Sequence, residues 1–425
     1  MNILSIESSC DETAAAIISG DPFSKEAHPE ILSNVVVSQI DIFKAYGGVI
    51  PEVAARSHLE AILPVIHQAF KEADFTSTDK SGNPKDDWGK IDAIAVTHTP
   101  GLLGSLLIGT LTARTLAILH NKPLYAVHHL KSHIYSNWLG NTGNTISGDL
   151  RRRRESRIGS SPVTTGRATD APEIRIPVFP ILALVISGGH TQIIRMTEHN
   201  HFEIIGTTYD DAVGECFDKV AKILGLPYPG GPSIAKAAKN GDPKKYHLPH
   251  PQIKDLDFSF SGLKTAVLRA VQKEVGVPIS YPSHQLKDLL SEQQVADFAA
   301  SFEQTACEIL LEKLEKALEK YPDTRSIVLA GGVSANNRLR EKCLGLLATT
   351  GSPRQRERTI GSPPVTTGRT TGARGANNLN IFFPELCFSG DNAAMVGAAA
   401  FYEIASGVQP TDPLSLNILP RSSIK

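Results

Sequence analysis

Two histidines one helical turn apart are the first residues whose spacing suggests chemistry. His129 and His133 lie four residues apart, so on a helix both imidazoles would share one face and could bind one metal ion. Chance alone gives roughly half of one such pair among 14 histidines, so a third ligand is needed. Asp391 follows an apolar run and precedes a segment of small residues, which suits a carboxylate aimed at a site. Leu130 occupies the position of the general-base glutamate in H-E-x-x-H, which disfavours a metallopeptidase.

Glycine-rich turns in the second half of the chain suggest a site for phosphate. Ser187-Gly188-Gly189 lies between two apolar runs, and its backbone N–H groups could form an anion site unobstructed by Cβ atoms. A single such turn is most often ordinary hairpin chemistry. Further glycine pairs at 230–231 and 331–332 favour a bound nucleotide over that alternative.

Acidic residues near these turns have two interpretations each. Asp11 and Glu12 occupy the turn of the first predicted hairpin, where they could hold a cation, a water or an amine, or could form an ordinary polar turn. Asp218 falls on a predicted helix after the second hairpin. It could accept hydrogen bonds from ribose hydroxyls, or belong to a solvated charged face.

The elements that must position these residues repeat along the chain. Residues 3–18 and 182–194 each read as strand, turn and strand, and both are followed by mixed strand and helix patterns. Apolar runs at 91–96 and 326–330 predict buried strands, and 292–320 has the spacing of a packing helix. Ser334 is a candidate helix N-cap. The pattern predicts an α/β protein of two similar lobes.

Composition divides the chain into an acidic body and two basic pieces. The 425 residues carry 43 basic and 44 acidic side chains, a net charge of −1, but residues 151–171 and 351–377 are each +4 and leave −9 for the rest. These two segments resemble each other and lack large apolar residues, so we expect disordered insertions; the alternative is a pair of nucleic-acid-binding arms.

Cysteine usage and the N-terminus favour a cytoplasmic protein. The five cysteines are scattered without a C-x-x-C pair, which suits a reducing compartment, and no targeting pattern opens the sequence. The most apolar stretch, 101–119, contains Gly104, Ser105 and Arg114, so we expect a buried helix and no membrane span.

Several of these motifs together resemble one known family. The sequence is similar to bacterial TsaD-like tRNA threonylcarbamoyladenosine transferases, which belong to the actin/hexokinase/Hsp70-like superfamily. The matching segments run in family order and include 6–13, 47–58, 100–105, 128–133, 187–192, 210–219, 228–232, 257–265, 330–336 and 391–392. The resemblance implies two actin/hexokinase/Hsp70-like lobes with a cleft between them. The first would be 1–127, with a helix in about 393–425 packing back on it, and the second would be 128–392.

The resemblance also implies a reaction and its participants. Threonylcarbamoyl-AMP would donate its threonylcarbamoyl group to N6 of the adenosine beside the anticodon, position 37, in tRNAs that read codons starting with A. One divalent metal ion, iron in preference to zinc, would act as a Lewis acid. The implied partners are tRNA, a paralogous TsaB-like subunit and a TsaE-like P-loop ATPase. Because the body is acidic, we expect partner subunits, local basic patches or the insertions to supply tRNA affinity.

Site residues follow from the resemblance position by position. The metal ligands would be His129, His133 and Asp391, and Glu12 would be a functional acid that positions the incoming amine or the hinge. The adenylate and its nucleoside would be bound by Val185, Ile186, Ser187, Gly188, Gly189, Asp218, Gly231 and Asn336.

The sequence departs from the family at two places. Lys131-Ser132 replaces the usual Glu-Gly between the histidines, and Ala235 replaces an acid often found after the glycine turn. Two other functions stay open at this point: a superfamily ATPase or kinase, suggested by the glycine turns, and a non-catalytic scaffold of a tRNA-modification complex, suggested by Lys131.

Overall fold

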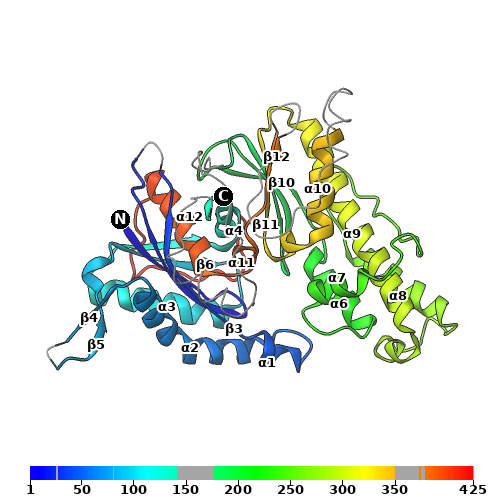
Figure 1. The fold of residues 1–425 in the computed structure, drawn as a ribbon, viewed down its shortest axis with the longest axis horizontal. Helices are drawn as coiled ribbons and strands as arrows, with labels where there is room; N and C mark the ends of the chain where they lie inside the picture. Colours follow the sequence, from blue (N-terminus) through cyan, green and yellow to red (C-terminus); the bar gives the residue numbers. More distant parts are fainter. Residues whose placement is uncertain (25–26, 80, 141–175, 350–372, 375–378, 425) are drawn as a thin grey trace, which may run out of the picture. The chain divides into compact units, whose positions relative to one another are not determined.

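The computed structural model describes residues 1–24, 27–79, 81–140, 176–349, 373–374 and 379–424. The chain forms two compact units (Figure 1), one of Met1–Ser38, Pro51–Ile176 and Asp391–Ser422 and the other of Gln39–Ile50, Pro177–Gly390 and Ser423–Lys425. The predicted basic insertions lie outside the described residues, except for Ala373–Arg374. The sequence placed the boundary between lobes at residue 127, whereas the described residues 128–140 group with the first unit.

A five-stranded sheet with the order β3-β2-β1-β6-β7 forms the centre of the first unit. The strands β1, β2 and β3 are antiparallel, and β6 and β7 run parallel to β1. The hairpin predicted within residues 3–18 is therefore confirmed, and a separate β4–β5 ribbon lies outside this sheet. The strands are β1 (Asn2–Glu7), β2 (Glu12–Ser19), β3 (Glu30–Ser38), β4 (Thr76–Thr78), β5 (Pro84–Asp86), β6 (Ala93–Thr99) and β7 (Leu124–His128).

Helices cover both faces of this sheet. Leu4 and Ile6 of β1 join the apolar core beneath α2 and α3, while Ser5, on the other face of the same strand, donates to the carbonyl of Ala393 in α12. This alternation follows from the two-residue period of a strand. The helices of the unit are α2 (Pro51–Glu72), α3 (Leu103–His120), α4 (His129–Tyr135) and α12 (Ala393–Ala405), with 3₁₀-helices at Trp88–Lys90 and Ser136–Trp138.

The second unit repeats this topology around a six-stranded sheet with the order β10-β9-β8-β11-β13-β12. Here β8, β9 and β10 are antiparallel, and β11 and β13 run parallel to β8. The predicted second hairpin and the strand 326–330 are confirmed, and so is the expectation of two similar α/β lobes. The strands are β8 (Ile181–Ile186), β9 (Thr191–Met196), β10 (Phe202–Thr207), β11 (Ser326–Ala330), β12 (Ala373–Arg374) and β13 (Asn380–Phe382).

A long central helix, α9 (Glu292–Lys320), organises the core of the second unit. It begins at a capping box of Ser291 and Gln294, and its apolar face joins one core with β8, β11 and α6. The helix predicted over 292–320 is therefore confirmed. The other helices are α1 (Ile40–Lys44), α6 (Val213–Ile223), α7 (Gly230–Ala238), α8 (Ser261–Glu274), α10 (Asn337–Thr349) and α11 (Leu386–Ser389), with 3₁₀-helices at Ser283–Leu289 and Gly332–Ala335.

Three local predictions need correction. The apolar stretch expected to be a buried helix forms α3, but only 33% of it is buried, because it packs on the sheet by one face. By length and composition α3 could span a membrane, a test that core helices of soluble proteins also pass. Ser334 caps no helix, because a 3₁₀-turn intervenes; the Asn336 side chain instead accepts from Leu339 N. The C-terminal helix ends at Ala405.

A buried ion pair joins α4 to α12. Lys131 Nζ lies 3.4 Å from Glu403 Oε1, and their side chains are 13% and 6% exposed. Burial raises the pKa of Glu403, and the Lys131 charge opposes this rise. Tyr135 of α4 stacks on Tyr402 of α12 beside the pair. Lys131, between the two histidines in sequence, is therefore engaged with α12.

Replacing Lys131 tests whether this ion pair stabilises the packing of α4 against α12. Lys131→Met would leave Glu403 buried without its cation and lower the free energy of unfolding at neutral pH by roughly 3 kcal/mol. The loss should shrink as pH falls, because the protonated carboxyl that burial favours needs no cation. Chemical denaturation across pH measures it.

A matched control and a double variant complete the test. Lys44→Met breaks an exposed pair with Asp41 and should leave the unfolding midpoint unchanged. Lys131→Met combined with Glu403→Leu should recover most of the loss. An equal loss in the double variant, or a loss independent of pH, would contradict the ion-pair account.

Candidate functional site

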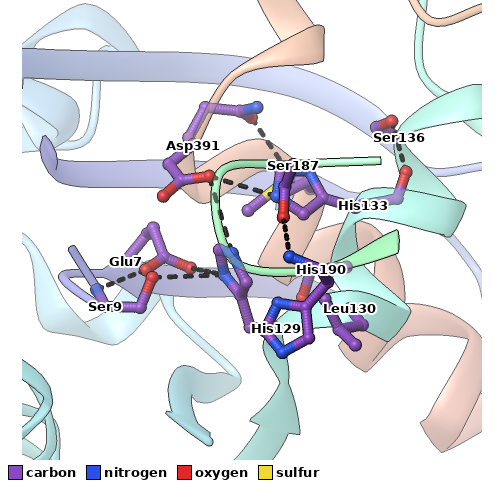
Figure 2. A network of polar contacts seen from close by, with 12 residues as sticks. Glu7, Ser9, His129, Leu130, His133, Ser136, Ser187, His190 and Asp391 are labelled. Carbon is purple, nitrogen blue, oxygen red and sulfur yellow. Dashed lines mark hydrogen bonds and ion pairs between the residues drawn. The ribbon is translucent and has the colours of Figure 1, made fainter. Parts of the chain in front are cut away.

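The structure brings together the three side chains predicted to bind a metal. His129 and His133 lie on one face of α4, and Asp391 lies just before α12 (Figure 2). Asp391 Oδ1 is 3.6 Å from His129 Nε2 and 3.1 Å from His133 Nε2. One ligand atom from each residue falls within 4.8 Å of the others. In the described part of the chain, this is the one group of three or more such residues placed to share an ion.

These three groups fit a divalent ion. Ligand atoms at zinc-like bond lengths in a tetrahedral site are about 3.4 Å apart, close to both observed separations from Asp391. Both ring nitrogens of His133 are buried; Nδ1 has no hydrogen-bond partner among the described residues, and Nε2 lies 3.1 Å from Asp391 Oδ1 without hydrogen-bond geometry. A buried polar atom without a hydrogen bond is costly, and coordination would satisfy one of these nitrogens. Two imidazoles and a carboxylate also suit zinc or ferrous iron.

Polar neighbours surround the other nitrogen of His129. Its Nδ1 lies 3.2 Å from Ser9 Oγ and 3.3 Å from Glu7 Oε2, as the dashed lines in Figure 2 show. Burial would raise the pKa of Glu7, but His129 and Thr97 hold it below its ordinary value. Burial would lower the pKa of His129, but Asp391 and Glu7 raise it to about 9. Metal binding must therefore displace a firmly held proton from this imidazole.

The β1–β2 turn presents acidic side chains in the same unit. Glu12 begins β2, and burial, with Asp391 and Asp11 close by, raises its pKa well above the ordinary value. His58 of α2 fixes this turn, because its ring nitrogens lie 2.7 Å from Thr13 Oγ1 and 3.0 Å from the Cys10 carbonyl oxygen. The contacts of His58 thus hold the turn in one conformation, with Glu12 close to Asp391.

The glycine turn of the second unit is shaped for a ligand's approach. Ser187 N donates to the His190 carbonyl, and His190 N donates back to Ser187 Oγ at 3.2 Å (Figure 2). Gly188 and Gly189 are exposed, and a Cβ at either would meet only open space. The preceding Val185 and Ile186 are fully buried at the end of β8, so they support the turn from within the core and expose no group to a ligand.

Asp218 of α6 contacts the glycine pair Gly230–Gly231 at the start of α7. Asp218 Oδ1 accepts from Gly230 N at 2.6 Å, which ties α6 to the first residue of α7. A Cβ on Gly230 would collide with the Asp218 backbone, whereas a Cβ on Gly231 would meet open space. Asp218 therefore has a structural partner, and Gly231 leaves room beside it. Ala235, where the family often has an acid, lies one turn further along α7.

Asn336 serves the protein's own structure. Its Nδ2 donates to Glu303 at 2.7 Å, and its Oδ1 accepts from Leu339 N at 2.9 Å, which begins α10. Glu303 also accepts from Arg338 Nε at 2.9 Å. The side chain is thus held in one orientation, and a nucleoside would meet an amide already fixed by two bonds.

Sequence reasoning missed two residues of this region. Glu7 is a fully buried acid at the end of β1, and His58 is a buried histidine that braces the acidic turn. A charge at the end of an otherwise apolar strand was the signal for Glu7, because such burial requires partners. His58 lies in a segment that matches the family, but no spacing predicted its role, since its partners lie 45 and 48 residues away.

Comparison with known proteins supports the family resemblance. The family model of TsaD, tRNA N6-adenosine threonylcarbamoyltransferase, matches residues 30–148 and 164–398. A relative of that name from Symbiobacterium thermophilum is 41% identical over 98% of this chain and 95% of its own length. Another from Moorella thermoacetica is 38% identical over 99% of this chain and 96% of its own length.

A solved structure supports the fold. HypF from T. kodakarensis matches 98% of this chain and 50% of that chain with a TM-score of 0.51 at 12% identity, which concerns fold alone. The predicted α/β class is confirmed, and the names of the relatives favour neither a superfamily ATPase or kinase nor a non-catalytic scaffold. On full-length identity to named relatives, the chain belongs to the tRNA N6-adenosine threonylcarbamoyltransferase family.

Proposed function

We propose that this chain transfers a threonylcarbamoyl group from threonylcarbamoyl-AMP to N6 of adenosine 37 in tRNAs that read codons starting with A. Family membership supports the reaction. One observation supports the chemistry of this reaction: ligand atoms of His129, His133 and Asp391 lie within 4.8 Å of one another. The proposed setting is the cytoplasm, with a TsaB-like subunit and a TsaE-like ATPase as partners.

Two imidazoles and a carboxylate would hold the divalent ion, iron in preference to zinc. His129 and His133 would bind through Nε2, and Asp391 through its carboxylate. When bound there, the ion would supply Lewis-acid chemistry to the phosphate and acyl groups of the donor. Glu12 would position the incoming adenosine amine and accept the proton that the amine loses on acylation.

The second unit would bind the adenylate. Backbone N–H groups of the turn at Ser187, Gly188 and Gly189 would contact phosphate, and the buried Val185 and Ile186 at the end of β8 would hold this turn in place. Asp218, Gly231 and Asn336 would surround the nucleoside. The open space at Gly188, Gly189 and Gly231 supports this arrangement, because side chains there would fill it.

Removing a ligand should remove the metal. Asp391→Asn and His133→Ala should lower bound metal from one ion per chain to near zero, and lower transfer at least about a hundredfold. Elemental analysis measures the first, and mass spectrometry of tRNA nucleosides after reconstitution with the donor measures the second. His67→Ala is the control, since His67 also pairs with a carboxylate, Asp86, at 2.7 Å. Full transfer by metal-free Asp391→Asn protein would refute the metal's role.

A pair of glycine substitutions tests the nucleotide site. Gly231→Val adds a side chain that meets only its neighbour Pro232, so it should lower the melting temperature less than Gly230→Ala does and raise KM for the donor by about tenfold or more. Gly230→Ala is the matched comparison, because its Cβ would collide with Asp218 and lower the melting temperature. Unchanged KM in a stable Gly231→Val protein would place the nucleoside elsewhere.

An apolar stripe on α3 supports the proposal of a paralogous partner. Leu103, Leu107, Leu111 and Ile118 follow helical spacing on the face away from the sheet, and they are 58%, 39%, 46% and 54% exposed. Exposed apolar rows of this kind mark protein interaction sites.

Leu111→Asp should therefore abolish co-elution with the TsaB-like subunit while leaving metal content intact. Leu289→Asp, at an exposed leucine of the second unit, is the control. Size-exclusion chromatography with light scattering reads the outcome. If Leu111→Asp still bound the TsaB-like subunit, the stripe would not be the binding site. If the substitution instead dissociated a homodimer, the stripe would bind a second copy of this chain.

A further inference from the structure

A fully buried carboxylate lies behind the candidate metal ligands. Glu7 is the last residue of β1 and has no exposed surface. Burying a carboxylate is costly unless hydrogen bonds compensate it. Its Oε1 accepts from Ser9 N at 2.6 Å, and its Oε2 accepts from Thr97 Oγ1 at 2.6 Å and lies 3.3 Å from His129 Nδ1. The protein has therefore built a site for this charge against one side of His129.

We propose that Glu7 is a positioning residue that fixes the tautomer of His129. Both oxygens of Glu7 accept hydrogen bonds, from Ser9 N and Thr97 Oγ1, so Glu7 acts as an acceptor here and Nδ1 beside it must carry the proton. A neutral imidazole protonated at Nδ1 has its lone pair on Nε2, the nitrogen that lies 3.6 Å from Asp391. Glu7 thereby directs the lone pair to the ion. This inference rests on the proposed metal site.

Ser9 cannot make this choice. Its Oγ lies 3.2 Å from the same nitrogen, but a hydroxyl both donates and accepts and would suit either tautomer. Only the carboxylate constrains the ring. Such carboxylate–histidine–metal arrangements raise the basicity of the ligand and hold its orientation.

Glu7→Gln is an informative substitution because the amide can take only one useful orientation. Ser9 N donates to the position of Oε1, so the amide oxygen of the glutamine must lie there. Its NH2 group then replaces Oε2 and donates toward His129 Nδ1. The imidazole must accept at Nδ1 and carry its proton on Nε2, which removes the metal-binding lone pair. A substitution of nearly equal volume thus reverses the tautomer.

Zinc affinity is the first measurement. Titration of the metal-free full-length chain with Zn²⁺, in competition with a chromophoric chelator, should give a Kd for Glu7→Gln that is higher by about 10- to 100-fold. Ser9→Ala removes a polar neighbour of the same nitrogen without adding a donor, so its Kd should stay within about threefold of the unsubstituted chain. Equal affinity in Glu7→Gln, or an equal loss in Ser9→Ala, would overturn the proposal.

The second measurement determines the tautomer of His129 directly. A purely structural role of Glu7 would not change this tautomer. Long-range ¹H–¹⁵N spectra of histidine-labelled, zinc-bound protein should show His129 protonated at Nδ1, with its signals assigned by their absence in His129→Ala. An unprotonated Nδ1 in the unsubstituted chain would overturn the proposal even if Glu7→Gln failed to fold. If the unsubstituted chain binds no Zn²⁺ or Fe²⁺, the proposed metal site itself fails. Binding that Glu7→Gln leaves intact defeats only the role of Glu7.

Discussion

The first unit depends on the return of the C-terminal segment to the sheet that begins the chain. Ser5 of β1 donates to the carbonyl of Ala393, 388 residues further along, at 2.7 Å. Gly397 makes this approach possible, because a Cβ there would overlap Ile18 of β2 and Ser5. Asp391 precedes α12 by two residues, so the packing that buries this helix also brings the carboxylate to the histidines of α4. Without it, the three ligand groups would not meet.

That packing buries charges, and each has compensation inside the same unit. Glu403 near the end of α12 pairs with Lys131, and Glu7 at the end of the central strand β1 is held by Ser9, Thr97 and His129. Buried pairs of this kind add little net stability but penalise other arrangements strongly, since a misplaced partner leaves a charge unpaired. The Lys131–Glu403 pair therefore restricts α4 and α12 to one packing arrangement more strongly than apolar contacts alone would.

Local pattern accounts for what the sequence predicted well. The hairpin at 182–194, the strand at 326–330 and the helix at 292–320 rest on short-range periodicity, and the structure confirms them. The residues whose roles were not predicted depend on contacts between segments far apart in the chain. The roles of Glu7 and His58 arise from partners in distant segments, and no spacing rule reports such contacts. Ser334 failed as a cap because a 3₁₀-turn displaced the helix start to Asn337. The four-residue spacing suggested the two histidines, the sequence around Asp391 suggested a carboxylate, family resemblance joined them in one site, and the structure adds their distances.

The two sheets share a strand order, yet their hairpin turns carry different chemistry. In the first unit the turn after β1 is polar and braced by His58, so its side chains act as fixed acids. In the second, the turn after β8 has two exposed glycines, so its backbone is what a ligand can reach. The same topological position thus presents carboxylates in one unit and N–H groups in the other. Different turn residues on one shared topology therefore give each unit its own chemistry, because carboxylates suit a cation or an amine and exposed N–H groups suit an anion.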